Sequence, residues 1–325
     1  MEREDLIQLW MAQGFLCSSL NKDMEDIVHE YFTILSQNSL FQEVERSYPP
    51  FGIFIKCKMH HLVHDLAKLV SRSETEDKLE NQHVAWDPSK SLKEMLRNGG
   101  HCLADIEELP SSIGVLIHLR YLNVSQTKIK ELPKSIGKLY NLQTLRMKDT
   151  WNLETFSKEM KILINLRHVY FHRRDEPVPF GMGRLKHLQT ISPVFTLDKE
   201  SNRSRIDELG GLNQLKGELI ISGLEHVRDR GQARASNLVG KAHLRRLTLE
   251  WGEYDEERKE KDNDVLECLR LNSVLEFLKI DRFVGSKLAS WMMPGSLPLN
   301  LTEIWLMTKK KETLFPALKS FRRVA

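Results

Sequence analysis

The chain has few cysteines and no long apolar run. Cys17, Cys57, Cys102 and Cys268 are far apart and form neither a CxxC pair nor a compact framework. Scattered thiols of this kind are typical of reduced, intracellular proteins. No uncharged apolar run approaches the roughly 18 residues that a membrane-spanning helix needs, and the first ten residues, MEREDLIQLW, carry charge where a secretory signal needs an apolar core. We therefore expect a cytoplasmic protein without a membrane span or an export signal.

The chain also lacks a strong excess of charge of one sign. Its 48 Lys and Arg residues face 45 Asp and Glu residues, which gives a net charge of +3. The distribution is uneven, because residues 1–75 hold 7 basic against 11 acidic residues. No single-sign field covers the whole molecule, and the head of the chain is acidic.

Leucine, in contrast, recurs at a steady interval. The pattern LxxLxxLxV begins at Leu116, and close versions of it begin at Leu139 and Leu163. The second leucine of the pattern recurs after 23 and then 24 residues. The next spacing is again short, and the later spacings are 26 to 31 residues. These second positions are Leu119, Leu142, Leu166, Leu188, Leu215, Leu244, Leu275 and Leu301. This spacing indicates leucine-rich repeats.

Each repeat is too small to bury its own apolar face. Leu122 and Val124 alternate with Tyr121, Asn123 and Ser125, so a short strand would point two side chains inward and three outward. Stacking converts the inward side chains into a continuous core. The predicted fold is therefore α/β: a leucine-rich-repeat solenoid with a curved parallel sheet and an irregular or helical convex side.

Two near copies, IEELPSSI at 106–113 and IKELPKSI at 129–136, place Leu-Pro before a ladder. Proline fixes φ and lacks a donor N–H, so it suits an irregular convex segment and would interrupt a helix. The charge run 253–264 mixes both signs, and we interpret it as a solvated loop that extends one repeat.

The first 75 residues have a different pattern. A helix from Asp23 is expected to bury Ile27, Tyr31 and Leu35. Two strands, around 40–44 and 53–57, are joined by a YPPFG turn, and an amphipathic helix over 62–70 follows. Together with a first helix that carries Trp10, these elements predict a small winged-helix-like α+β domain.

These segments carry a family resemblance. The runs EDLIQLWMAQGFL, MEDIVHEYFTILSQNSLFQEVE and CKMHHLVHDLA, together with the LPSSIGVLIHLRYLNVSQTKIKELPKSIGKLYNLQTLRM and LKGELIISGLEHV stretches, resemble plant nucleotide-binding leucine-rich-repeat disease-resistance proteins of the coiled-coil class. The resemblance implies three parts: the winged-helix end of the nucleotide-binding NB-ARC domain at 1–75, a linker and degenerate first repeat at 76–102, and about eight repeats at 103–325. A new ladder starts at Leu318 and stops, so we expect a C-terminal truncation.

The resemblance implies an innate-immunity receptor rather than an enzyme. Its repeats would bind protein, either a pathogen effector or a guarded host protein, and would restrain the NB-ARC domain of the full-length family. A switch driven by ADP and ATP is the alternative function, since these nucleotides are the cofactors of the full-length family.

The nucleotide hypothesis depends on one motif. The family's Met-His-Asp motif falls on Met59, His60 and His61, and its histidine, which contacts the β-phosphate of ADP, corresponds to His60. His61 stands where the family has aspartate. Two interpretations stay open: a loosened closed state, because an aspartate would favour the helix N-terminus, or a decayed gene copy.

A second departure bears on the same hypothesis. No GxxxxGK[ST] phosphate loop occurs in the sequence. We expect the remainder of the nucleotide-binding domain upstream of Met1, and no cofactor for this chain alone.

Two further functions receive less support. His60 and His64 are four residues apart, as in zinc-binding helices, but HHLVH lacks the glutamate of HExxH and no third ligand is identifiable, so we predict no metal site. A winged helix that binds nucleic acid would need a basic face, whereas this segment is acidic.

The outward strand positions are the predicted protein-binding residues of a concave face, because exposed aromatic and arginine side chains anchor protein partners. They are Tyr121, Asn123, Ser125, Thr144, Arg146, Lys148, His168, Tyr170, His172, Arg246, Thr248, Glu250, Phe277, Lys279, Asp281, Glu303 and Trp305.

Overall fold

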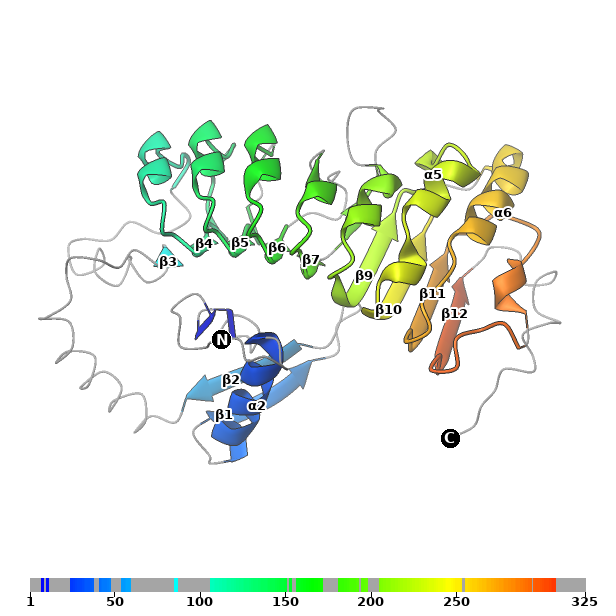
Figure 1. The fold of residues 1–325 in the computed structure, drawn as a ribbon, viewed down its shortest axis with the longest axis horizontal. Coiled ribbons are helices and arrows are strands. Elements are labelled where there is room, and N and C mark those ends of the chain that lie inside the picture. The colour runs from blue at the N-terminus through cyan, green and yellow to red at the C-terminus, as the bar shows by residue number, and fades with distance from the viewer. Residues whose placement is uncertain are drawn as a thin grey trace, which may run out of the picture.

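A computed structural model gives the fold of most of the repeat region and parts of the head. It describes residues 7–8, 10–11, 24–37, 41–47, 54–59, 85–86, 106–150, 152–153, 156–171, 181–192, 194–197, 205–252, 255–293 and 295–307. In the repeat region the helical segments lie side by side along one edge, and the strands lie along the opposite edge (Figure 1).

The predicted ladders form parallel strands. One five-stranded sheet has the order β3-β4-β5-β6-β7, and a second has the order β12-β11-β10-β9-β8. The strands of the first sheet are β3 (Ala85–Trp86), β4 (Tyr121–Asn123), β5 (Thr144–Arg146), β6 (His168–Tyr170) and β7 (Thr190–Ser192). Those of the second are β8 (Phe195–Thr196), β9 (Lys216–Ser222), β10 (His243–Glu250), β11 (Phe277–Asp281) and β12 (Glu303–Met307). β3 lies inside the stretch that we interpreted as a linker, and it pairs with β4.

The core forms between neighbouring repeats, as the alternation predicts. Leu122 lies opposite Leu145, which lies opposite Val169, and all three side chains are fully buried. A single cluster of buried apolar residues runs from Leu109 to Met292. The repeats from β4 to β11 therefore bury their inward residues against their neighbours, whereas Ile304 and Leu306 of β12 are only half-buried.

The helical edge consists mostly of short 3-10 helices. They are Ser111–Val115, Lys134–Lys138, Lys158–Ile162, Met182–Arg184, Ile206–Gly211, Leu224–His226, Leu238–Gly240, Glu256–Arg258 and Ser290–Met292. Pro110 and Pro133 are the residues before the first two, at φ −64° and −65°. Both prolines lie on the side away from the strands, as predicted, but each precedes a short 3-10 helix rather than an irregular segment.

The charge run 253–264 is not a solvated loop. Its described part enters the 3-10 helix Glu256–Arg258 and then α6 (Lys259–Cys268). α6 buries Asp262, Val265 and Leu266 against the repeat core. The apolar residues that anchor the helix come at the end of the charged stretch, so charge alone gave the wrong interpretation.

The head contains α2 (Met24–Gln37) and an antiparallel pair, β1 (Phe41–Ser47) with β2 (Phe54–Met59). The strand pair and the helix are those that we predicted, but the buried stripe differs by one residue. Tyr31 is 49% exposed, whereas Phe32 is 5% exposed and packs with Trp10 and Leu35. The predicted helix over 62–70 lies outside the described residues.

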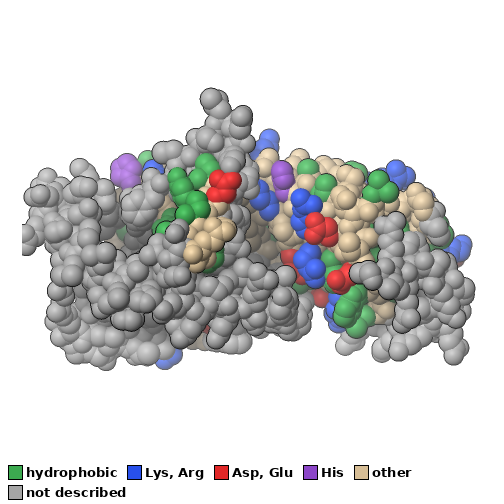
Figure 2. All heavy atoms as spheres, turned by 90° about the horizontal axis from the view of Figure 1, so that it is seen from below, with side chains coloured by type: hydrophobic (Ala, Val, Ile, Leu, Met, Phe, Trp, Pro, Cys, Tyr) green, Lys and Arg blue, Asp and Glu red, His purple; other side chains and the backbone are tan. Residues whose placement is uncertain are grey.

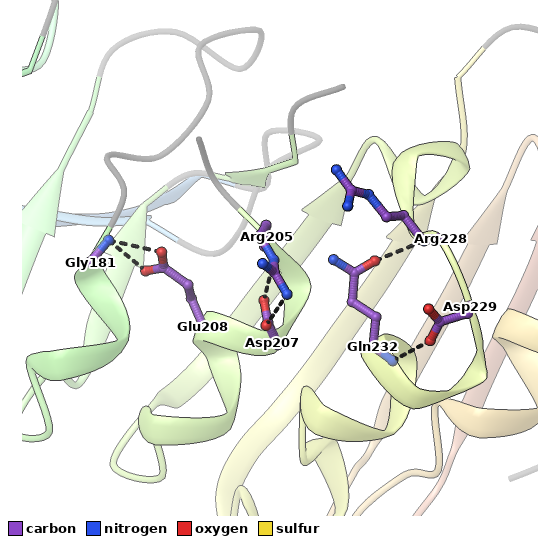
Figure 3. Close-up of polar contacts among 7 residues, drawn as sticks. All are labelled: Gly181, Arg205, Asp207, Glu208, Arg228, Asp229 and Gln232. Atoms are coloured by element: carbon purple, nitrogen blue, oxygen red, sulfur yellow. Dashed lines mark hydrogen bonds and ion pairs between the residues drawn. The ribbon is translucent and has the colours of Figure 1, made fainter. Parts of the chain in front are cut away.

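Polar side chains hold successive repeats together and cap their helices (Figure 3). The Glu208 carboxylate accepts hydrogen bonds from the backbone N–H groups of Gly181, at 2.8 and 3.0 Å, and Gly183, at 3.0 Å. Asp229 caps α5 (Arg230–Ala235) by accepting from the Gln232 N–H at 2.8 Å, and the Gln232 side chain accepts from the Arg228 N–H. These bonds satisfy donors that the short helices leave open.

A buried lysine replaces one of the core leucines. Lys241 holds the repeat position that Leu212 holds in the preceding repeat, and it is fully buried. Its Nζ donates to the carbonyl oxygens of Leu209, at 2.6 Å, and Leu212, at 3.2 Å. Burial lowers the pKa of Lys241 to about 8, so the ammonium depends on these carbonyls.

Close packing of two glycines gives a first testable prediction. A Cβ at Gly211 would lie 2.2 Å from the backbone oxygen of Gly183 in the neighbouring repeat. We expect Gly211→Ala to lower the free energy of unfolding by about 1–3 kcal/mol in urea titrations, since backbone must move. Gly231→Ala in α5 is the matched control, because its Cβ would meet only the Asp229 side chain. An unchanged Gly211→Ala protein would contradict the packing.

The buried carboxylate of Asp262 predicts a pH dependence. Burial raises its pKa to about 6, against the opposing effect of Arg258 and Lys261, from an ordinary 3.8. A raised folded-state pKa stabilises the fold fully below the unfolded pKa, and this contribution is lost as pH rises through about 6.

We therefore expect Asp262→Asn to raise the free energy of unfolding near neutral pH by on the order of 2 kcal/mol. The variant should also lack the part of the pH slope that Asp262 causes. Urea titrations on both sides of the folded-state pKa measure this. Asp264→Asn is the control, because Asp264 lies on the same helix and pairs with Arg230 at the surface at 2.5 Å. Loss of stability in Asp262→Asn with an unchanged pH slope would disprove the assignment.

Candidate functional site

The candidate site is the strand face, which we define as the face of both sheets that points away from the leucine core. Strand register brings the predicted residues together in rows across it. In the first sheet Tyr121, Thr144 and His168 form one row, and Asn123, Arg146 and Tyr170 form the next. In the second sheet the rows are Arg246 with Phe277 and Glu303, Thr248 with Lys279 and Trp305, and Glu250 with Asp281.

The half of this face on β4–β6 is buried, contrary to the expected exposure. Arg146 is 4% exposed and Tyr170 is 7% exposed, and Tyr121, Thr144 and His168 are also buried. Tyr121 and Tyr170 do not belong to the leucine core cluster. Their burial therefore arises on the strand face itself.

The N-terminal segment of the chain lies against these residues. The Gln8 side-chain amide donates to the Tyr170 hydroxyl, and its oxygen accepts from Arg146 Nη1 at 3.4 Å. The Arg146 guanidinium lies 4.6 Å from the centre of the Tyr170 ring, and Lys148 Nζ lies 5.3 Å from it. One glutamine thus meets a cation–aromatic cluster built from two neighbouring strands.

The helical residues around Gln8 are anchored to the head. Ile7 and Met11 are buried and pack with Trp10 and with Ile27 of α2. Trp10 also packs against Phe32. Apolar contacts fix this segment to α2, and Gln8, itself 4% exposed, makes polar contact with the repeats.

His168 is a neutral member of the buried half. Its Nδ1 lies 3.2 Å from Thr190 Oγ1 on the adjacent strand. Burial, with the positive charges of Arg167, Lys216 and Arg146 nearby, lowers the pKa of His168 to about 3. The imidazole is therefore uncharged at physiological pH and adds no charge to this half of the face.

The half on β10–β12 is only partly open: Glu303 and Trp305 are exposed, whereas Thr248, Glu250 and Phe277 are buried, contrary to the expected exposure. The Arg246 guanidinium lies 3.9 Å from the centre of the Phe277 ring, which is 6.4 Å from the Trp305 ring. Lys279 Nζ pairs with Asp281 at 3.2 Å, and Trp305 is 51% exposed. Seen from the strand side, basic and acidic side chains gather over the second sheet (Figure 2).

Several residues of the face were missed by sequence reasoning. β9 adds Glu218 beside Arg246 and Ile220 beside Thr248. Burial raises the pKa of the Glu218 carboxyl, and Arg246 opposes this rise. The stretch KGELIIS holds three consecutive apolar residues, Leu219 to Ile221, so alternation does not show that Ile220 points outward. Gln8 is different, because no periodic signal connects it with the repeats.

The remaining predicted residues have less defined surroundings. Ser125 Oγ accepts from the Lys148 N–H at 3.0 Å, in the turns after β4 and β5. Met59 ends β2, whereas His60, His61, His64 and His172 lie outside the described residues, so the nucleotide assignment stays a prediction. Over the described part of the chain, no His, Cys, Asp and Glu side chains cluster as a metal site would require. No described helix has the length and apolar character to cross a membrane.

Comparison with known proteins identifies both halves of the chain. Residues 1–67 match the family model of the disease resistance protein winged helix domain, and residues 206–324 match that of the R13L1/DRL21 leucine-rich repeats. Disease resistance protein RGA2 of Solanum bulbocastanum is 34% identical over 317 residues, which cover 90% of this chain and 32% of the relative. Disease resistance protein RGA5 of Oryza sativa subsp. japonica is 38% identical over 66 residues, or 20% of this chain and 6% of that protein.

Solved structures give a more distant likeness. A leucine-rich-repeat protein of Leptospira interrogans, LIC12759, has a TM-score of 0.37 at 20% identity, covering 55% of this chain and 42% of that chain. An internalin of Listeria monocytogenes has a TM-score of 0.41 at 16% identity, covering 66% and 54%. The chain spans about a third of the length of the curated relatives that it matches over most of its own length. With the winged-helix match at one end and the repeat match at the other, the chain belongs to the nucleotide-binding leucine-rich-repeat disease-resistance proteins.

Proposed function

We propose that this chain is the sensing and restraining part of a cytoplasmic plant immune receptor, and that it acts by binding protein rather than by catalysis. The family membership supports the receptor role. We also infer that the two sheets form one curved solenoid, because the Lys216 N–H donates to the Gln189 carbonyl at 2.9 Å and so links the strand regions of both. The strand face would then be one continuous surface that serves both restraint by the head and recognition of a protein partner.

The observation that carries the proposal is the contact of Gln8 with Arg146 and Tyr170. Through this contact a segment of the winged-helix head meets strand positions that are buried, which supports a role in restraint. We infer that this contact is the restraint, and that a partner which needs β5 and β6 must displace the head. Binding of such a partner would shift the population toward the released state in proportion to its preference for that state.

The recognition role falls on the other half of the face. Trp305 is a large, exposed aromatic residue, and Arg246 stacks on Phe277, which is buried. Arginine and aromatic side chains of this kind are enriched among the residues that dominate protein–protein binding energy. The neighbouring Lys279–Asp281 pair gives polar contacts of both signs. We propose that a pathogen effector or a guarded host protein binds here.

A charge placed at Gln8 tests the restraint. We expect Gln8→Lys to repel Arg146 and Lys148, and to increase hydrogen exchange in residues 7–11 and 24–37 by about tenfold, since a charge-assisted contact contributes roughly 1.5 kcal/mol. The repeat amides should keep their protection. The double variant Gln8→Lys with Arg146→Glu should restore protection of the head, because it recreates a favourable pair.

The matched control is Gln8→Lys with Lys279→Glu, which reverses a charge on the second sheet, away from Gln8. It should exchange like Gln8→Lys alone. Unchanged exchange in Gln8→Lys, or equal rescue by Lys279→Glu and Arg146→Glu, would refute the restraint proposed here.

A further inference from the structure

A row of exposed apolar side chains lies on the helical edge, far from the strand face. We call it the turn ridge and define it as Val115, Ile117, Tyr140, Ile162 and Ile164. Their exposed fractions are 76%, 37%, 46%, 50% and 57%. All five lie at the ends of the 3-10 helices of three successive repeats or one to two residues beyond. Exposed apolar side chains that recur at the same turn of successive repeats are a feature of interaction surfaces.

The backbone holds these side chains in register. The Ile117 N–H donates to the Val115 carbonyl at 2.8 Å, and the Ile164 N–H donates to the Ile162 carbonyl at 2.8 Å. The turn therefore has the same backbone hydrogen bond in both repeats. Asn141 Nδ2 donates to the Ile117 carbonyl at 2.8 Å. In the next repeat Asn165 Nδ2 donates to the Tyr140 carbonyl at 2.7 Å. Each ridge turn is thus tied to its neighbour.

In the fourth repeat the same turn carries cations instead of aliphatic residues. The Lys186 N–H donates to the Arg184 carbonyl at 3.0 Å, in the same positions that Ile162 and Ile164 occupy one repeat earlier. Lys138 holds the corresponding position in the second repeat, and both it and Lys161 are exposed. The aliphatic stem of Lys138 lies over Gly114, which leaves its ammonium at the surface.

The turns that carry the turn ridge hold few acids. Across the described turns 111–120, 134–142, 158–166 and 182–188, Glu159 is the one acidic residue. It accepts a hydrogen bond from Ser157 at 2.6 Å, and this bond, together with Lys134 and Lys161, lowers the pKa of its carboxyl. Within these turns exposed lysine and arginine accompany the apolar row almost without opposing charge, although Glu107, Glu108 and Glu131 are exposed on the segments that lead into the first two.

We propose that the turn ridge binds the surface of an anionic phospholipid bilayer. Aliphatic residues and a tyrosine that enter the interface, with lysine and arginine beside them, are the features of peripheral membrane-binding segments. The ridge protrudes from a row of helix ends, which suits a deformable lipid surface more than a preformed protein pocket. The strand face differs, because it mixes both signs in pairs such as Lys279–Asp281.

This site goes beyond the proposed receptor function and works independently of it. The Gln8 contact lies on the strand face, and the turn ridge lies along the helical edge (Figure 1). A chain held at a membrane by the ridge would keep its strand face open to protein.

Vesicle sedimentation with the full chain tests the proposal. We expect the chain to sediment with vesicles of phosphatidylcholine and phosphatidylserine but not with phosphatidylcholine alone, and salt should weaken the binding. The triple variant Ile117→Ser, Ile162→Ser and Ile164→Ser should bind at least about tenfold more weakly, because it removes the apolar contacts. Lys138→Glu with Lys186→Glu should weaken binding by removing the charge attraction.

The control is Trp305→Ser with Met307→Ser, which removes comparably exposed apolar side chains from the strand face and should sediment like the wild type. Circular dichroism melting should show that every variant keeps its fold. Equal binding by the triple variant, or a wild-type chain that remains in the supernatant with anionic vesicles, would overturn the proposal. If the wild-type chain does not sediment with anionic vesicles, a protein is the remaining candidate partner for this edge. Neither result would affect the Gln8 restraint, whose readout is hydrogen exchange.

Discussion

Burial between neighbouring repeats is the constraint on which the whole repeat region depends. No repeat can enclose Leu119 or Leu142 by itself, yet both are fully buried because the next repeat covers them. The requirement applies only to the inward positions. The turns on the helical edge and the outward positions on the strands are free to change from repeat to repeat, so one backbone can carry different surfaces on its two sides.

Buried polar side chains show the limits of this variation between repeats. Lys241 and Asn272 take core positions held by leucine in earlier repeats, and each is accepted because carbonyl oxygens of a neighbouring repeat receive its hydrogen bonds. Asp262 is also buried, and burial outweighs the nearby Arg258, Lys261 and Trp251 groups that favour its charged form. Its raised pKa is the cost of that position. The repeat array thus tolerates buried donors that reach carbonyls more readily than a buried carboxylate.

Local pattern was sufficient to predict the strands, because the alternation of Leu122 and Val124 with outward residues depends only on neighbours in sequence. The same rule assigned Tyr121, Arg146 and Lys279 to one sheet face before their register was known. It failed where a tertiary contact decides the outcome. Phe32 rather than Tyr31 is buried because Trp10 packs on it, and α6 forms because Val265 and Leu266 find the repeat core.

The candidate site shows the same difference between what local sequence predicts and what tertiary contacts decide. Membership of the strand face follows from sequence, whereas its exposure does not. Gln8, which contacts the buried Arg146 and Tyr170, is 138 residues from Arg146 and 162 from Tyr170, and a single glutamine carries no sequence signal of the residues that it contacts. The outward positions could therefore be identified from the sequence, but which of them are buried could not.

The chemistry of that contact bears on how the proposed restraint could be released. Gln8 meets Arg146 through a neutral amide oxygen, and the nearby His168 is uncharged. A carboxylate in place of this amide would form a salt bridge, with a charge on both partners, and such a pair is stronger. The contact through Gln8 therefore contributes less free energy than a salt bridge would at the same position.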